Sequence, residues 1–271
     1  MSTSPPDFAS IKQHQQRMWA TGDYAAVATP LVVVSENLCE AADLRAGSRV
    51  LDIACGSGNT AIAAARRNCI VTGVDYVPEL LERGRERATA ERLHVDFETG
   101  DAELLPFPNG SFDVVLSTFG TMFAPNQARA AGEMARVCRP GGKIGMANWT
   151  PESWIGTMFR IVSRYVPPPP HLQPPTRWGT ATGLRELFGD GLADLAIEHR
   201  TFTFRYTSRD HWLDFFRTNF GPLITAYATL DPMAAQLLTD EIRDAAAAAN
   251  RAKDGTFVVD SGYLEVVATR R

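Results

Sequence analysis

A turn with two glycines near residue 57 carries the residue types of a nucleotide site. An apolar run begins at Val50 and ends in Asp52, and Gly56 and Gly58 follow before an Ala-rich, helix-forming segment. Strand, tight turn and helix in this order open nucleotide-binding α/β domains, in which the backbone of the turn approaches the ligand closely. The segment therefore predicts a site for a nucleotide-like ligand.

A second acidic position follows at the spacing of a loose dinucleotide fingerprint. Gly56 and Gly58 with Ala61 satisfy the Gly-x-Gly-x-x-Ala pattern, and Asp75 lies about twenty residues further on, where a ribose-binding acid is expected. A short-chain dehydrogenase would also need an acid/base group such as Tyr-x-x-x-Lys. None of the six tyrosines has a lysine four residues later, but other dehydrogenases do not use that pair.

The elements around the turn predict a parallel sheet that positions these residues. Segments of strand and helical character alternate, which is typical of right-handed crossovers with helices on both faces. The expected strands are 49–54, 69–76, 94–102, 111–120, 143–149, 197–206 and 262–269. The expected helices are 11–26, 25–42 with a break at Pro30, 60–67, 78–92, 127–138, 153–165, 208–220 and 232–250. We expect a Rossmann-like, seven-stranded, mostly parallel sheet with a helical lid inserted near the C-terminus.

Three regions of one domain are expected. Residues 1–45 form an N-terminal helical cap, 46–150 form the Rossmann-like core, and 151–271 supply the lid and the remaining strands. The stiff segment Pro167–Pro170 connects the core to the lid. The turn Arg139-Pro140-Gly141-Gly142 is expected to end a helix before the fifth strand.

Composition excludes several classes of function. The formal net charge is −4, hydrophobic residues make up 45% and charged residues 21%, so general affinity for nucleic acid is not expected. No stretch is apolar enough to span a bilayer, and the polar start Met1–Ser10 lacks the pattern of a secretory signal. The four cysteines are scattered, which argues against a disulfide framework or a metal site. We expect a cytoplasmic protein with no membrane or nucleic-acid partner, of unspecified oligomeric state.

Four blocks, in chain order, resemble class I S-adenosylmethionine-dependent methyltransferases. They are 52–58, in which Ala54 replaces the more usual glycine, the pair at 74–75, the stretch 100–115, and the turn at 136–142. The likeness is closest to the small-molecule group typified by the quinone-biosynthesis C-methyltransferases. It covers residues 49–149 well and the C-terminal half poorly.

The resemblance implies S-adenosyl-L-methionine as the cofactor and methyl transfer to a small molecule. It implies that the glycine turn lies beneath the methionine portion, that Asp75 accepts from both ribose hydroxyls, and that Asp101 accepts from the adenine amino group. Cofactor contacts are expected from Asp52, Ala54, Gly56, Gly58, Asp75, Tyr76, Asp101, Ala102, Ser117 and Phe119. No catalytic residue is named among the five histidines, and no metal is expected.

Several alternatives stay open from the sequence. The chain is a methyltransferase, an NAD-type oxidoreductase, or a module that binds the cofactor without catalysis. Asp52 serves either the turn or the ligand, and Phe119 either the ligand or the core. Lys12, Gln16, Trp19 or Tyr24 reaches the cofactor's carboxylate, or Trp19 merely anchors its helix. An apolar or aromatic acceptor is expected if the lid aromatics face the cleft: Trp154, Phe159, Trp178, Trp212, Phe215, Phe216, Phe220 and Tyr227.

Overall fold

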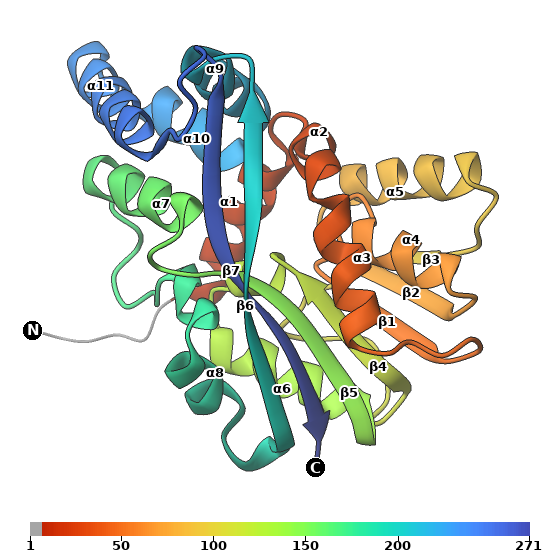
Figure 1. Ribbon diagram of the computed structural model, residues 1–271. Helices are drawn as coiled ribbons and strands as arrows, with labels where there is room; N and C mark the ends of the chain where they lie inside the picture. Colours follow the sequence, from red (N-terminus) through yellow and green to blue (C-terminus); the bar gives the residue numbers. More distant parts are fainter. Residues whose placement is uncertain (1–6) are drawn as a thin grey trace, which may run out of the picture.

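Within residues 7–271, which the computed structural model describes, seven strands form one sheet (Figure 1). The strands are β1 (Arg49–Ile53), β2 (Ile70–Asp75), β3 (Asp96–Thr99), β4 (Phe112–Thr118), β5 (Cys138–Trp149), β6 (Leu192–Tyr206) and β7 (Phe257–Arg270). Their order is β3-β2-β1-β4-β5-β7-β6. The strand β7 pairs antiparallel with both β5 and β6, whereas the pairs among β1 to β5 are parallel. The predicted seven-stranded, mostly parallel sheet is confirmed.

Helices cover both faces of this sheet. They are α1 (Phe8–Ala20), α2 (Tyr24–Ala28), α3 (Val32–Ala41), α4 (Asn59–Arg66), α5 (Pro78–Ala90), α6 (Gln127–Val137), α7 (Trp154–Tyr165), α8 (Ala181–Phe188), α9 (Arg209–Asn219), α10 (Gly221–Thr229) and α11 (Pro232–Ala249). None of these helices, within residues 7–271, combines the length and hydropathy that a bilayer crossing requires. Residues 1–6, which include Pro5 and Pro6 of the predicted polar start, lie outside the described part of the chain.

Alternation along the central strands explains why both faces are covered. Val50 and Val114 pack in an apolar cluster with α3, α4 and α5, whereas their neighbours Leu51 and Val115 pack in a second cluster with α6 and α7. Successive side chains of a strand point to opposite faces, so a continuous apolar run requires cover on each side. With both faces of the central strands covered, the ends of the strands are left to build a site.

The helices α9, α10 and α11 are inserted between β6 and β7 and pack with α7 beside the upper halves of these two strands (Figure 1). Their core is aromatic: the Trp212 ring lies 5.0 Å from that of Trp154, 5.0 Å from that of Phe216 and 5.6 Å from that of Phe257, measured between centroids. These rings therefore stabilise the insertion itself.

The sequence prediction was incomplete at several elements. The strands β6 and β7 each begin five residues earlier than expected, and α2, α8 and α10 were not predicted as separate helices. The expected turn at Arg139–Gly142 lies inside β5, which begins at Cys138. A register shift between Phe112 and Val114, with Gly141 at φ +70°, accommodates the glycines within the strand pair. This bulge lets β5 pair with β4 on both sides of the segment Arg139–Gly142, where its glycines and proline had predicted a turn.

Candidate active site

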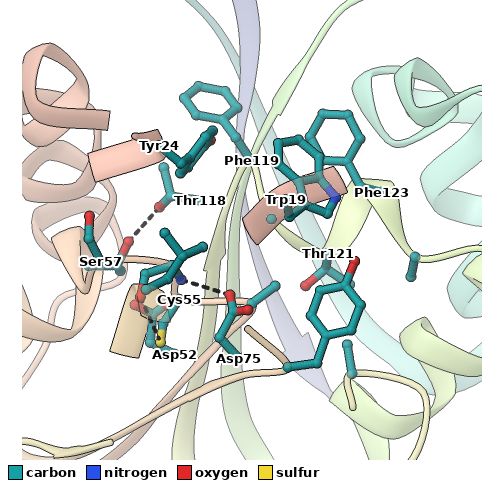
Figure 2. A pocket seen from close by; sticks show the side chains of 18 of the residues that line it. Trp19, Tyr24, Asp52, Cys55, Ser57, Asp75, Thr118, Phe119, Thr121 and Phe123 are labelled. Carbon is teal, nitrogen blue, oxygen red and sulfur yellow. Dashed lines mark hydrogen bonds between the residues drawn. The ribbon is translucent and has the colours of Figure 1, made fainter. Parts of the chain in front are cut away.

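A cavity lies at the carboxyl edge of the parallel strands, next to α1 and α2 (Figure 2). The register pairs Asp52 with Leu116 and Asp75 with Thr99, so the residues that follow these positions emerge at one edge. The lining comes from α1, α2 and α3, from the glycine turn and the start of α4, from the ends of β2 and β4, and from 100–103 and 119–125. Ligands of open α/β sheets bind at this edge.

The glycine turn that lines the cavity requires left-handed backbone. Ala54, Gly56 and Gly58 have φ values of +52°, +53° and +82°. A Cβ at Gly58 would lie 2.8 Å from the Phe97 ring, whereas a Cβ at Gly56 would meet nothing closer than the Tyr24 ring at 3.8 Å. The turn therefore requires glycine at position 58, where a Cβ would clash with Phe97. At Gly56 the space on the cavity side is free of other atoms within ordinary contact distance except the Tyr24 ring.

Asp52 lies beneath the turn with one oxygen unpaired. The Ala61 N–H donates to its Oδ2 at 2.9 Å, but Oδ1 has no hydrogen-bond partner and the residue is only 1% exposed. Burial raises the pKa of Asp52 to about 8, with a smaller raising contribution from Asp75 and a lowering one from the Ala61 N–H. The carboxyl is therefore a buried group that a positive charge would stabilise in its ionised form.

Asp75 joins the end of β2 to the glycine turn. The Gly56 N–H donates to its Oδ2 at 2.9 Å, and the Val77 N–H donates to Oδ1 at 2.9 Å. Burial raises the pKa of Asp75 to about 6, although these N–H donors lower it. Each oxygen has a second lone pair, so the carboxylate can still accept from a ligand.

At the far end of the cavity, Lys12 of α1 contacts two acids. Its Nζ donates to Asp101 Oδ2 at 2.6 Å and lies 3.0 Å from Glu103 Oε2. The Glu103 N–H donates to Asp101 Oδ1 at 2.9 Å, and the Asn126 N–H donates to Glu103 Oε1 at 2.7 Å. The segment 100–103 is thereby fixed to both α1 and α6.

Hydroxyls form another part of the lining. Ser35 Oγ lies 3.0 Å from Thr60 Oγ1, which donates to Thr118 Oγ1 at 2.8 Å. The three residues come from α3, α4 and β4, and all three line the cavity. They bring hydroxyl groups close to the glycine turn.

Aromatic rings form the remaining wall. Figure 2 shows the rings of Trp19, Phe119 and Phe123 above the carboxylates of Asp52 and Asp75 in that view. Trp19 packs edge-on against Phe123 at 4.9 Å and against Tyr24 at 5.4 Å, measured between ring centroids. Trp19 is 8% exposed, so it anchors α1 and lines the cavity at the same time.

Eight of the ten predicted cofactor residues line this cavity, and two do not. The lining includes Asp52, Ala54, Gly56, Asp75, Tyr76, Asp101, Ala102 and Phe119. Gly58 packs on Phe97, and Ser117 turns inward: its Oγ donates to the Ile53 carbonyl at 2.8 Å and accepts from the Thr121 N–H at 3.0 Å. The next residue of β4, Thr118, lies in the lining instead.

Other lining residues were missed because their signal is not local. Ser35, Asn59, Thr60 and Thr118 had no pattern that singled them out, and Glu103 was only part of a block. The aromatic residues of the lid region that the sequence offered for the cleft are absent from the lining among residues 7–271. The aromatic wall comes instead from α1, α2 and the segment after β4.

The charge of the cavity is strongly acidic. Among the described residues that line it, four carry carboxyl groups, Asp52, Asp75, Asp101 and Glu103, and Lys12 is the one Lys or Arg. Within residues 7–271 no group of three or more His, Cys, Asp or Glu side chains is placed to hold a metal ion. The cavity therefore suits a ligand with positive charge and hydroxyl or amino donors.

Comparisons with known proteins agree with this geometry. Residues 50–142 match a family described as a methyltransferase domain. An uncharacterised protein of Mycobacterium tuberculosis is 42% identical over 225 residues, 82% of each chain, and the demethylmenaquinone methyltransferase of Deinococcus radiodurans is 37% identical over 124 residues, 44% of this chain and 52% of that one. The crystal structure of the Bacillus subtilis YcgJ protein superposes with a TM-score of 0.60 at 23% identity, covering 88% of this chain and 98% of that chain, which establishes the shared fold.

Proposed function

Because this chain belongs to the class I S-adenosylmethionine-dependent methyltransferases, we propose that it methylates a small apolar or aromatic acceptor at the cavity beside α1. S-adenosylmethionine is the methyl donor of the enzymes that the four sequence blocks resemble. It supplies an electrophilic methyl group on a positively charged sulfur. The proposal concerns which residues hold the donor and what kind of molecule receives the methyl group.

The observation that carries the proposal is the charge of the lining. Four carboxyl groups and one lysine surround the cavity among the described residues. The donor has one net positive charge, whereas a nicotinamide dinucleotide brings the two negative charges of its pyrophosphate. Carboxylates attract the first and repel the second. The residues therefore fit the methyl donor better than the dinucleotide that the glycine pattern alone allows.

Each acid is proposed to hold one part of the donor. Asp75, at the end of β2, accepts from the ribose hydroxyls with the free lone pairs of its two oxygens. Asp101 accepts from the adenine amino group, and the Ala102 N–H donates to a ring nitrogen. Asp52 and the open side of Gly56 face the methionine portion. No step of the reaction requires these acids to transfer a proton.

The acceptor is proposed to lie against the aromatic wall. Trp19, Phe119 and Phe123 line the cavity, and Ala124 and Pro125 extend the apolar surface. The wall positions an apolar or aromatic molecule and excludes water from the reacting atoms. Alignment and exclusion of water are the main contributions a protein makes when the leaving group is already activated.

Calorimetry and methyl transfer test the proposal separately. The folded protein is titrated with S-adenosylmethionine and with NAD; we expect binding of the first only. It is then incubated with donor carrying a radiolabelled methyl group and two acceptor sets, phenolic or quinol-like molecules and strongly polar amino acids or polyamines. Label in the first set supports the acceptor class. Label only in the polar set contradicts the acceptor class, and binding of NAD alone contradicts the whole proposal.

A further inference from the structure

The helix α1 meets the cavity with one face. Lys12, Gln16 and Trp19 are four and three residues apart, a spacing that places them on the same side of a helix. The Gln16 Nε2 donates to the Tyr76 carbonyl, and Trp19 packs on Phe123. Lys12 lies at one end of this face, next to the segment proposed to bind adenine. From the sequence, Lys12 was one of four residues expected to reach the cofactor's carboxylate. In the structure, Lys12 instead forms ion pairs with Asp101 and Glu103.

Lys12 balances two carboxylates that lie side by side. The Glu103 side chain is 3% exposed and that of Asp101 33%, while that of Lys12 is 25% exposed. Arg129 also reaches this segment, but its Nε donates to the Glu103 carbonyl rather than to either carboxylate. Within residues 7–271 Lys12 makes the ion pairs of both acids. Loss of its charge would leave two like charges facing each other.

The direction of the Asp101 carboxylate follows from these contacts. Its Oδ1 accepts from the Glu103 N–H at 2.9 Å and its Oδ2 from Lys12 at 2.6 Å. With both oxygens held, the carboxylate plane is set, and one lone pair on each oxygen stays free for a further donor. A carboxylate set in advance binds an amino group with less loss of side-chain freedom than a rotating one.

We propose that Lys12 is a positioning residue for adenine recognition: it orients Asp101 toward the exocyclic amino group and links that contact to α1. The inference rests on the proposed role of Asp101 in the donor site. Lys12 does not touch the reacting atoms, so its loss weakens donor binding and leaves the rate at saturating donor nearly unchanged.

The test uses S-adenosylhomocysteine and its 6-oxo analogue S-inosylhomocysteine, which lacks the amino group. Calorimetry measures both ligands on the wild type, Lys12→Met and Lys12→Arg, with Arg17→Met as a control that removes a charge from the exposed side of α1. We expect Lys12→Met to weaken S-adenosylhomocysteine binding about tenfold, Lys12→Arg to restore most of it, and Arg17→Met to change little. The penalty of Lys12→Met should nearly disappear with the 6-oxo analogue. Thermal melting checks that each variant is folded.

Three outcomes overturn the inference. Unchanged binding by folded Lys12→Met removes Lys12 from the site. Tighter binding shows that Lys12 competes with the ligand for Asp101. An equal penalty for both ligands shows that Lys12 acts on the fold of α1 and not through the amino group. Failure of the wild type to bind S-adenosylhomocysteine would instead contradict the proposed donor site, so the two failures are distinguishable.

Discussion

Replacement of Asp52 by Asn should remove a pH-dependent loss of stability. The pKa of Asp52 is raised by burial from 3.8 to about 8 in the folded protein. Between these two values the folded state binds more protons at this position than the unfolded chain does. The free energy of unfolding therefore falls as pH rises from about 4, and the full penalty is present above about pH 8. A carboxyl with a lowered pKa would show the opposite sign.

The magnitude follows from the linkage relation. Between about pH 5.5 and about pH 8.5, Asp52 alone should lower the unfolding free energy of the wild type by about 2 to 3 kcal/mol. Asn cannot titrate, so the Asp52→Asn variant escapes this loss. Its amide oxygen can still accept from the Ala61 N–H, but its NH₂ group would replace the unpaired Oδ1 without an acceptor. That defect costs about 1 to 3 kcal/mol at every pH.

Urea denaturation of both proteins at about pH 5.5 and about pH 8.5, without cofactor, separates the pH-dependent loss of stability from the pH-independent cost of the Asn amide. Asp113→Asn is the matched control, because the Arg49 N–H and Arg139 lower the pKa of Asp113. Its contribution is complete above the unfolded pKa and is constant across this pH window. If wild type and Asp52→Asn lose stability in parallel as pH rises, the buried carboxyl does not carry the penalty and the reasoning is wrong.

Four further substitutions separate the fold of the site from its binding surface. Gly58→Ala should lower the unfolding free energy by about 1 to 3 kcal/mol because of the positive φ at this position. The clash of the new Cβ with Phe97 adds a further cost. In urea melts, the second substitution Phe97→Leu should restore only the part of the free energy that the clash removes. Ser117→Ala should lower the unfolding free energy by about 1 to 3 kcal/mol, because it leaves buried hydrogen-bond partners unpaired. Thr118→Val should instead mainly raise the donor Kd measured by calorimetry. If the two variants lose equal stability, Thr118 does not belong to the lining. Asp75→Asn should weaken donor binding by roughly tenfold or more, and an unchanged Kd would exclude Asp75 from the ribose site.

The predictable part of the site is the part encoded by contiguous sequence. Asp52, the glycine turn and Asp75 follow directly from where β1 and β2 end, because parallel strands deliver their carboxyl ends to one edge. The choice between Ser117 and Thr118 depended on which side of β4 faces the cavity. Alternation along a strand predicts that neighbouring side chains lie on opposite faces, but it does not predict which of them reaches a cavity at the end of the strand. In β4 the Ser117 hydroxyl donates to the Ile53 carbonyl and does not face the cavity.

Contacts between distant segments account for the rest. Lys12 and Asp101 are 89 residues apart, and no local pattern links them. The lid aromatics were a reasonable source of acceptor contacts by composition, but Trp212 is fully buried among Trp154, Phe216 and Phe257. An aromatic residue packs wherever it buries the most surface, so its type alone does not distinguish a cavity wall from a core.

The buried acids connect the stability of the protein to its proposed chemistry. Asp52 and Asp75 have raised pKa values because burial removes water without supplying a cation. At neutral pH a pKa of about 8 leaves Asp52 mostly protonated and a pKa of about 6 leaves Asp75 mostly ionised, and both shifts cost stability in the free protein. A positively charged donor would favour the ionised forms and offset that cost on binding. After methyl transfer the sulfur is neutral, so the attraction weakens while the contacts to ribose and adenine are kept. With the donor in this cavity, as proposed, the same carboxylates would bind the donor more tightly than its product, which would help the product to leave.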